Sequence, residues 1–410
     1  MRRRVVVTGM AGLSPLGGDW PTIRAGLLAG RSGVCVMPEW AGYDGLDTRL
    51  GAPVPDFAVP GHYPRKKVRS MGRVALMATR ATELALADAG LTGSTLVTDG
   101  TMGIAYGSTS GSPPAMEIYA EAFYTKRSLK GIAGTDYLQF MSHTCAANLA
   151  QFFGITGRVV PTCSACTAGS QGIGYAYEAI VGGRQNLMVA GGAEELHAVN
   201  AAVFDIMFAT STRNDEPERT PRPFDRARDG LVVGEGAGTL VLEELEHARA
   251  RGARIYAEVA GFGTNGDGTH ITNPDVRGMQ TVMELALRDA GLVPADVGYV
   301  NAHGTATEAG DIAESVATFR VFGDRVPISS LKSYLGHTLG AGGALEAWLS
   351  IMMLREDWFA PTLNLDDPDP RCAPLDYVRG EPRAVRVEHV MSNNFAFGGV
   401  NTSLIFTRWS

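Results

Sequence analysis

Cys166 has the sequence surroundings of a nucleophile. The β-branched run at residues 159–162 predicts a strand before it, and residues 167–180 predict a helix after it. A helix N-terminus presents free N–H groups and a positive dipole end, which lower the pKa of a thiol. Small residues beside the sulfur leave room for a substrate: Ala165, Ala168 and Gly169. A buried structural cysteine, or a redox pair with Cys163 in a C-x-x-C motif, is the alternative.

Two histidines occupy positions that would bring them to the same place as Cys166. His303 follows a predicted strand over residues 297–300, and His337 is predicted to open a helix. Strand ends and helix starts of this kind meet at one edge of a parallel sheet, so we expect the three side chains to lie together. A histidine at a helix N-terminus is biased towards the neutral form and can donate a hydrogen bond without carrying charge. Either histidine alone is equally explained as a polar residue near the edge of a core, with its hydrogen-bonding groups paired.

A short internal repeat indicates that the chain contains two related halves. Residues 83–91 recur as residues 284–292 with one difference. Each copy predicts the end of a helix, with a glycine just beyond it and a turn and a strand to follow. Each half also opens on a predicted strand, at residues 5–7 and at residues 255–259.

The alternation of predicted strands and helices indicates an α/β fold class. Strands that alternate with helices favour parallel sheets covered by helices. We therefore expect a duplicated α/β fold, with one half over residues 1–250 and the other over residues 251–410. Cys166 and His337 are then expected at the N-termini of equivalent helices. The Pro-, Arg- and Asp-rich residues 213–229 predict a long ordered loop.

Composition excludes several classes of protein. The 410 residues are 45% hydrophobic and 19% charged, with a formal net charge of −7, which is ordinary for a globular protein and unlike a nucleic-acid binder. No apolar run reaches membrane-spanning length, and the apolar stretch near Met1 is too short for a secretory signal. The five cysteines are an odd number without a second C-x-x-C pair for zinc. We expect no metal, no disulfide scaffold and a cytoplasmic location.

Five stretches, in order along the chain, resemble the elongating β-ketoacyl-acyl carrier protein synthases, which are condensing enzymes of the thiolase superfamily. They are Ser-Ala-Cys-Thr-Ala-Gly at 164–169, Pro-Phe-Asp, Arg-Asp-Gly and Gly-Glu-Gly-Ala-Gly within 223–238, Asn-Ala-His-Gly-Thr at 301–305, Lys-Ser and Gly-His within 332–337, and Asn-Asn-Phe-Ala-Phe-Gly-Gly-Val-Asn at 393–401. The resemblance covers nearly the whole chain. It implies a thiolase fold, in which two duplicated α/β halves form five layers, α-β-α-β-α, and normally a dimer.

The resemblance also implies a reaction. Cys166 would attack the thioester of an acyl carrier protein and hold the acyl chain, with the backbone N–H groups of Cys166 and Phe397 as the oxyanion hole. Neutral His303 and His337 would donate hydrogen bonds to the enolate that forms when a malonyl thioester loses CO2. The carbanion would then attack the acyl group. The phosphopantetheine arm belongs to the carrier protein, so no bound cofactor is expected.

Further residues take roles by the same resemblance. Lys332 joins the catalytic set, and three acidic residues would support it and the histidines: Asp311, Glu314 and Glu346. Three threonines are expected to bind the substrate arm: Thr272, Thr305 and Thr307. Phe397 would gate the acyl pocket, and Ser110 stands where many relatives carry a larger apolar residue, which implies a roomier or more polar acyl tunnel. If the resemblance is set aside, Lys332 is interpreted as a surface lysine and the three acidic residues as ordinary helix carboxylates. The threonines are then interpreted as turn residues, and Phe397 as a packing residue.

An acidic acyl carrier protein is the implied partner, and a basic cluster is its expected docking site. The cluster comprises Arg65, Lys66, Lys67, Arg69, Lys126, Arg127 and Arg213. Local positive potential steers an acidic partner whatever the net charge of the whole chain. For any single residue, a solvated helix face is the alternative. The chain is expected to form a homodimer, or a heterodimer with a chain-length-factor-like subunit, and to bind neither nucleic acid nor membrane.

Three related activities fit the sequence less well. A thiolase needs a second cysteine in the C-terminal glycine-rich loop, and residues 395–400 contain none. An initiating synthase would combine its cysteine with one histidine and one asparagine, whereas His337 supplies a second histidine. A non-catalytic chain-length factor lacks the nucleophile that Cys166 provides.

Overall fold

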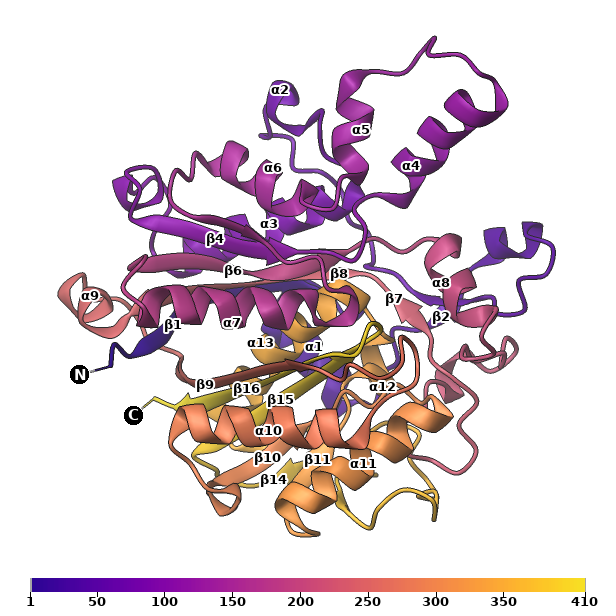
Figure 1. Cartoon of the computed structure of the whole chain (residues 1–410), viewed down its shortest axis with the longest axis vertical. Coiled ribbons are helices and arrows are strands. Elements are labelled where there is room, and N and C mark those ends of the chain that lie inside the picture. Colours follow the sequence, from indigo (N-terminus) through magenta and orange to yellow (C-terminus); the bar gives the residue numbers. More distant parts are fainter. Residues whose placement is uncertain (1, 410) are drawn as a thin grey trace.

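Eleven strands form the central sheet of the chain, which the computed structural model describes over residues 2–409 (Figure 1). The strands of the first half are β1 (Val5–Leu13), β4 (Met102–Gly107), β5 (Val159–Pro161), β6 (Leu187–Glu194) and β8 (Gly236–Glu244). Those of the second half are β9 (Ala257–Gly266), β10 (Val297–Asn301), β11 (Pro327–Ser329), β13 (Asp376–Tyr377), β15 (His389–Ala396) and β16 (Val400–Arg408). The two sets join where three residues of β1 pair with three of β9.

Both halves arrange their strands in the same order. The first half runs β5-β4-β6-β8-β1 and the second runs β11-β10-β15-β16-β9, with β13 added at the outer edge. In each half the strands nearest the outer edge pair in parallel, and the remaining pairs are antiparallel. The expected parallel pairing is therefore found among the outer strands of each half, and the inner pairs depart from it. In the second half the reason is local, because β15 and β16 form a hairpin around two glycines of positive φ, Gly398 and Gly399.

Helices fill three layers around these strands (Figure 1). The outer layer of the first half contains α3 (Arg73–Asp88) and α6 (Thr144–Phe153), and the outer layer of the second half contains α10 (Val276–Ala290) and α11 (Glu308–Phe322). The central layer contains α7 (Ala168–Val181) and α13 (Gly342–Arg355), which pack between the two halves of the sheet. The predicted five-layer thiolase fold is confirmed. The other helices are α1 (Trp20–Leu28), α2 (Arg65–Val68), α4 (Pro113–Ala120), α5 (Gly134–Phe140), α8 (Ala198–Asp205), α9 (Leu245–Ala250) and α12 (Lys332–Leu335).

The repeated sequence forms equivalent helix ends. In α3 and α10 the last helical residues are followed by Gly90 and Gly291, which take φ values of 68° and 69°. Such left-handed backbone suits glycine because it has no Cβ to clash with the following carbonyl. The predicted helix ends are confirmed at both positions.

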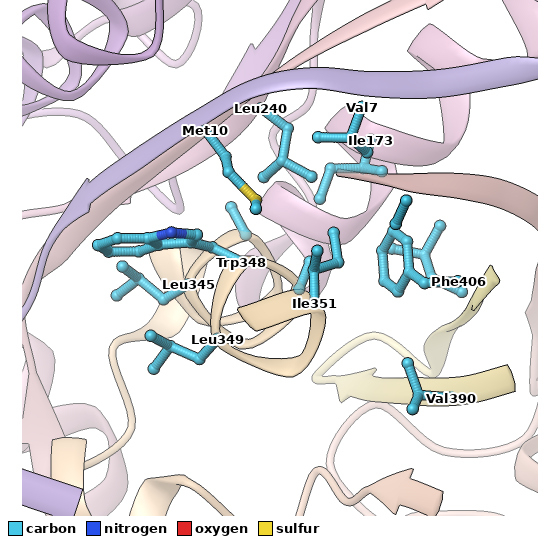
Figure 2. Close-up of a cluster of buried hydrophobic side chains, with 14 of the residues drawn as sticks. Val7, Met10, Ile173, Leu240, Leu345, Trp348, Leu349, Ile351, Val390 and Phe406 are labelled. Atoms are coloured by element: carbon cyan, nitrogen blue, oxygen red, sulfur yellow. The ribbon is translucent and has the colours of Figure 1, made fainter. Parts of the chain in front are cut away.

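The largest buried cluster lies in the central layer and joins the two halves. Figure 2 shows side chains from several elements meeting there, among them Val7, Met10, Ile173, Leu240, Trp348, Ile351, Val390 and Phe406. Two close backbone approaches hold α7 against α13 and the turn before it. A Cβ on Gly169 would lie 2.8 Å from the Gly340 carbonyl oxygen, and one on Gly343 would lie 2.7 Å from the Ser170 nitrogen. This contact fixes the start of α7 beside the segment that leads into α13.

Candidate active site

Cys166 lies in a tight turn between β5 and α7. A single 3-10 turn, Ala165–Thr167, leads directly into α7. Ala165 takes a φ of 49°, a left-handed conformation that is uncommon for a residue with a side chain and is often found at functional sites. Cys166 is buried and is 5% exposed. The sequence therefore places a cysteine on a strained turn at the start of a central-layer helix.

The structure brings the three predicted side chains together. The Nε2 atom of His337 lies 3.0 Å from the Sγ atom of Cys166. The His303 ring is nearly perpendicular to the His337 ring, with 5.2 Å between their centroids. The cysteine comes from the first half of the chain and both histidines from the second, so the duplicated fold assembles this group.

His337 does not open a helix, contrary to the sequence prediction. It follows α12 and Gly336, and the 3-10 turn Leu339–Ala341 separates it from α13. Its backbone instead bonds to the β7 region (Val233–Gly234): its N–H donates to the Val232 carbonyl, and its carbonyl accepts from the Gly234 N–H. Backbone pairing therefore fixes this histidine.

The pKa of the Cys166 thiol also differs from the prediction. Burial raises its pKa to about 12, and the nearby carboxylate of Glu194 acts in the same direction. The charge of Lys332 and hydrogen bonds from the backbone N–H groups of Phe397 and Cys166 oppose this effect without overcoming it. The pKa is therefore raised rather than lowered as expected at a helix start, because desolvation of the sulfur by burial is the largest effect. The free protein holds a thiol, so its proton must leave during the reaction.

Both histidines are held in the neutral form. Burial lowers the pKa of His303 and of His337 well below its ordinary value, and the charge of Lys332 lowers both further. A neutral imidazole carries one N–H, so each ring can donate one hydrogen bond to an oxygen atom in the cavity. The predicted neutrality agrees with these directions, although its physical cause is burial and a nearby cation.

Lys332 is a buried cation, and its partner is Glu346. Each is 2% exposed, and the Lys332 ammonium donates to Glu346 Oε1. The second oxygen of Glu346 accepts from Asn394 Nδ2 at 2.7 Å. A buried ion pair of this kind is costly to break, because either group left alone would be an unpaired charge. The surface-lysine interpretation of this position is therefore wrong.

Two carboxylates hold the loop that carries His303. Glu314 accepts from the backbone N–H groups of His303 and Gly304 at 2.7 Å each, and Asp311 accepts from those of Thr305 and Ala306 at 3.1 Å. Both carboxylates lie on α11, and burial raises the pKa of Glu314 to about 8 and that of Asp311 to about 6. They act on the backbone of the loop rather than on the imidazole ring.

A cavity of about 570 Å³ leads to this group. Seven of the predicted site residues other than Cys166 line it: Thr272, His303, Thr305, Thr307, Glu314, His337 and Phe397. The hydroxyls of Thr305 and Thr307 are 2.9 Å apart. Thr307 is the residue before α11, but its side chain does not cap that helix. Both hydroxyls are therefore available to a ligand in the cavity.

Phe397 and Ser110 differ in their relation to this cavity. Phe397 lines it, contacts the Phe204 ring at 5.1 Å between centroids, and directs its backbone N–H at the Cys166 sulfur. Ser110 is exposed and is not among the residues lining the cavity. The structure thus puts the proposed gate at the sulfur and leaves Ser110 at the surface of the single chain.

Only part of the predicted basic cluster is free. Three of its members around α2 are exposed: Arg65, Lys66 and Arg69. Lys67 is half-buried and donates to the Phe152 carbonyl at 2.6 Å. Arg213 bonds to the Ala227 carbonyl and lies 3.4 Å from Asp229. Lys126 pairs with Glu121, and Arg127 is exposed beside it. Lys67 and Arg213 therefore have structural partners, and none of the cluster lines the cavity.

Sequence reasoning gave no role to Glu194, which lies buried behind the cysteine. Its Oε2 atom accepts from the N–H and the hydroxyl of Thr109 and from the N–H of Gly340. It thus ties the loop after β4 to the turn that follows His337. Burial raises its pKa to about 7. No local pattern marks this residue, because its contacts come from parts of the chain that are far apart in sequence.

The titration of Glu194 should appear in the stability of the protein. Because its pKa is raised on folding from 4.5 to about 7, the folded state favours the protonated form. The stability that this group contributes is fully present below pH 4.5 and is lost as the pH rises through about 7. We expect Glu194→Gln to remove that part of the slope in a series of melting temperatures between these values. Exposed Glu284→Gln is the matched control, and an unchanged slope in Glu194→Gln would contradict the assignment.

Two other kinds of site are absent from residues 2–409. No helix in this range is long and apolar enough to cross a bilayer. No group of three or more His, Cys, Asp or Glu side chains in the same range is arranged to hold a metal ion.

Comparisons with known proteins agree along the whole chain. The family models "Beta-ketoacyl synthase, N-terminal domain" and "Beta-ketoacyl synthase, C-terminal domain" match residues 2–248 and 256–366. A 3-oxoacyl-[acyl-carrier-protein] synthase 2 of Vibrio harveyi is 41% identical over 99% of each chain. A 3-oxoacyl-[acyl-carrier-protein] synthase 1 of Escherichia coli strain K12 is 38% identical, also over 99% of each.

Solved structures give the same result. A β-ketoacyl synthase from Burkholderia phymatum STM815 is 59% identical, with a TM-score of 0.98 over 100% of each chain. The ishigamide ketosynthase/chain length factor is 33% identical with a TM-score of 0.92, again over 100% of each chain. A type II ketosynthase structure with its acyl-carrier protein, AntDE:AntF, is 30% identical with a TM-score of 0.87 and the same coverage.

Proposed function

The chain belongs to the β-ketoacyl synthase family, and we propose that Cys166, His337 and His303 carry out its reaction. It is a condensing acyltransferase of fatty-acid or polyketide synthesis, which joins an acyl group to malonyl-acyl carrier protein with loss of CO2. One observation carries the assignment of residues. A buried thiol lies 3.0 Å from a neutral imidazole, with a second neutral imidazole against the first, at a cavity large enough for a thioester arm.

The first step transfers the acyl group to the protein. The Cys166 sulfur attacks the thioester carbonyl of the acyl carrier protein, and the thiol proton leaves through His337 Nε2. The backbone N–H groups of Cys166 and Phe397 stabilise the oxyanion. The carbon–sulfur bond to the carrier arm then breaks, and the departing sulfur takes the proton. The products are an acyl-Cys166 thioester and a free carrier thiol.

The second step forms the new carbon–carbon bond. The malonyl thioester loses CO2, and the electron pair of the broken bond enters the enolate. His303, neutral with its proton on Nε2, donates a hydrogen bond to the enolate oxygen. His337 donates a second one after exchange with solvent has moved its ring proton from Nδ1 to Nε2. The enolate carbon attacks the acyl carbonyl, the bond to Cys166 breaks, and a solvent proton restores the thiol. The product is a β-ketoacyl thioester on the second carrier protein.

The surrounding residues keep this group in the required state. Burial and the charge of Lys332, which is paired with Glu346, keep both imidazoles neutral. Glu314 and Asp311 fix the loop of His303. Thr305, Thr307 and Thr272 are proposed to bind the arm of the carrier protein, which is supported by their place in the cavity lining. These steps require no organic cofactor bound to the enzyme, because phosphopantetheine arrives as part of the substrate.

A reconstituted reaction tests the proposed function. The purified protein is mixed with an acyl carrier protein thioester and malonyl-acyl carrier protein, and CO2 release and the mass of the carrier-bound product are measured. We expect one CO2 for each β-ketoacyl product. Decarboxylation without a new carbon–carbon bond, or no reaction with either carrier, would contradict the proposal.

Carrier docking is proposed to use the free part of the basic cluster, Arg65, Lys66 and Arg69. Reversing two of these charges, Lys66→Glu with Arg69→Glu, should raise the KM for carrier-bound substrates about tenfold at low salt, because steering of an acidic partner is lost. The measurement compares carrier-bound thioesters with thioesters of free pantetheine. Arg320→Glu with Arg325→Glu, exposed charges elsewhere, is the control. Equal loss with both kinds of substrate would refute the docking role.

A second subunit is proposed to cover the edge of the sheet at β5. Val159 on this edge strand is 43% exposed, and the neighbouring excursion through α4 and α5 exposes Tyr124 and Leu129 (Figure 1). Ser110 precedes that excursion, so a subunit placed there would enclose it in an acyl tunnel. The second subunit is either a copy of this chain or a chain-length-factor-like protein. Native mass spectrometry of the protein expressed with its genomic neighbours distinguishes the two, and a monomer in both cases would refute the proposal.

We propose two further assignments. Residues 1–250 and 251–410 are duplicated halves, which is supported by their shared strand order. The protein acts in the cytoplasm, where malonyl thioesters on carrier proteins would be available to it. Fractionation of the source cells would test this location, and recovery of the protein outside the cytoplasm would refute it.

A further inference from the structure

The Phe204 ring lies beside two of the residues that are assigned to the reaction. Its centroid is 5.1 Å from that of the Phe397 ring and 6.4 Å from that of the His337 ring. Phe204 is 6% exposed and lines the same cavity as Cys166. The backbone N–H of Phe397 is directed at the Cys166 sulfur. The contacts that fix Phe204 therefore also bear on the oxyanion hole.

The residue that follows Phe204 anchors the end of its helix. Asp205 is the last residue of α8, and its side chain is buried. Its Oδ2 atom accepts from the Asp47 N–H at 2.8 Å. Its Oδ1 atom accepts from the Thr48 N–H at 3.1 Å and from the Thr210 hydroxyl at 2.5 Å. One carboxylate therefore ties the end of α8 to a segment far away in the sequence.

The segment that Asp205 holds leads into the small sheet that fixes His337. Thr48 lies just before β3 (Leu50–Ala52), and β3 pairs in parallel with β7. The backbone of His337 bonds to the same β7 region. Figure 1 shows α8 and β7 on the same side of the molecule. Asp205 thus connects the helix that carries Phe204 to the strands that carry His337.

The anchor depends on hydrogen bonds rather than on an ion pair. The three donors to Asp205 are two backbone N–H groups and one hydroxyl, and no basic side chain within residues 2–409 forms an ion pair with it. Burial of a charge without a cation is costly. A carboxylate, however, offers two acceptor oxygens, whereas an amide or a hydroxyl offers one. The carboxylate is thus the side chain that can hold all three donors.

The helix α8 has few other contacts that could fix its position. It is eight residues long, and a helix this short has little stability of its own. Its inner face buries two alanines beside Phe204. Its outer face leaves Val199 41% exposed and Val203 51% exposed. The position of the helix end therefore depends strongly on the three hydrogen bonds of Asp205.

We propose that Asp205 is a positioning residue for acyl transfer and that it acts through the Phe204 ring. The carboxylate fixes the end of α8, the Phe204 ring supports the Phe397 ring, and the Phe397 N–H stays aimed at the Cys166 sulfur. The proposal rests on the proposed function, because that N–H matters only if an oxyanion forms at Cys166. Asp205 is not among the residues lining the cavity. Its loss should therefore slow acyl transfer without weakening the binding of the substrate.

Asp205→Asn tests this role with a side chain of the same shape. The amide has one acceptor oxygen instead of two, so at least one of the three hydrogen bonds is lost. The measurement is acyl loading onto Cys166 in a single turnover, followed by intact mass over a range of acyl carrier protein thioester concentrations. We expect the maximal loading rate to fall about tenfold, because the oxyanion donor is no longer held in place. The concentration that gives half the maximal rate should not change.

Thr210→Val is a milder variant at the same anchor. Valine keeps the size of the threonine side chain but removes the hydroxyl that donates to Asp205. The other two donors stay in place, so the variant should fold even if Asp205→Asn does not. We expect its maximal loading rate to fall by a smaller factor than that of Asp205→Asn.

A double-mutant cycle separates positioning from a general loss of stability. In a Phe204→Ala background, Asp205→Asn should cause no further fall in the loading rate, because no ring remains to be positioned. Glu243→Gln is the matched control. The Glu243 carboxylate is also buried, and it bonds to Arg251 and His247. This variant loses a buried acceptor as well, yet it should load the acyl group at the wild-type rate.

Three results would overturn the positioning role alone. They are an unchanged loading rate in folded Asp205→Asn, a fall of equal size in the Phe204→Ala background, and a raised half-maximal concentration with an unchanged maximal rate. If Asp205→Asn does not fold, an unchanged loading rate in Thr210→Val would overturn the role. If the wild type neither loads Cys166 nor makes a β-ketoacyl product, the proposed function fails together with the role of Asp205.

Discussion

Replacing Cys166 with serine is expected to lower the rate of β-ketoacyl product formation by about 10,000-fold. The serine oxygen would occupy the position of a sulfur 3.0 Å from His337, but it is a far weaker nucleophile unless a stronger base activates it. Burial already raises the pKa of the Cys166 thiol to about 12, and a hydroxyl in the same place would hold its proton more tightly. The measurement is product formation from acyl and malonyl carrier proteins.

Cys163 supplies the matched control for this variant. It lies three residues earlier, is exposed, and its thiol donates to the Ser142 carbonyl. Under the nucleophile assignment, Cys163→Ser should keep nearly full activity. If the C-x-x-C pair were a redox centre instead, both variants would fail together. Full-rate condensation by Cys166→Ser would remove the basis of the assigned reaction.

Replacing His303 with alanine is expected to separate the two steps of the reaction. His337, not His303, is the histidine within hydrogen-bond distance of the Cys166 sulfur, so acyl transfer to Cys166 should continue in the variant. The enolate would lose one of its two hydrogen-bond donors, and loss of such a donor costs about 100-fold to 1000-fold in rate. Intact mass measures acyl loading in a single turnover, and CO2 release measures decarboxylation.

His337→Ala is the contrasting variant, because His337 serves both steps. It should slow acyl loading and decarboxylation together. If the rate of acyl loading in His303→Ala falls as far as the rate of decarboxylation, the separate roles assigned to the two histidines from their geometry are contradicted.

Sequence patterns predicted the fold because its main signals are local. The repeat at 83–91 and 284–292 marks equivalent helix ends. Each copy of the repeat is followed by equivalent strands of the two halves. The motifs around Cys166, His303 and His337 were sufficient to predict that these side chains meet. The antiparallel pairs were missed, because the direction of pairing depends on which strands become neighbours after the chain has folded.

The errors at the site have a common physical origin in burial. Proximity to a helix start predicted a lowered pKa for Cys166, but complete desolvation of the sulfur decides the direction. Lys67 counted as a free cation in the sequence, yet its ammonium is engaged by the Phe152 carbonyl. Glu194 was not singled out at all. Its role depends on residues that the fold brings near it, and a single sequence shows no such neighbours.

The position of the acyl group after loading tests the central assignment most directly. The protein is incubated with an acyl carrier protein thioester alone, digested, and fragmented in the mass spectrometer to locate the added mass between residues 159 and 184. We predict the acyl mass on Cys166 in the wild type and in Cys163→Ala. Acylation of Cys163 or Ser164, or loading that survives in Cys166→Ala, would contradict the account.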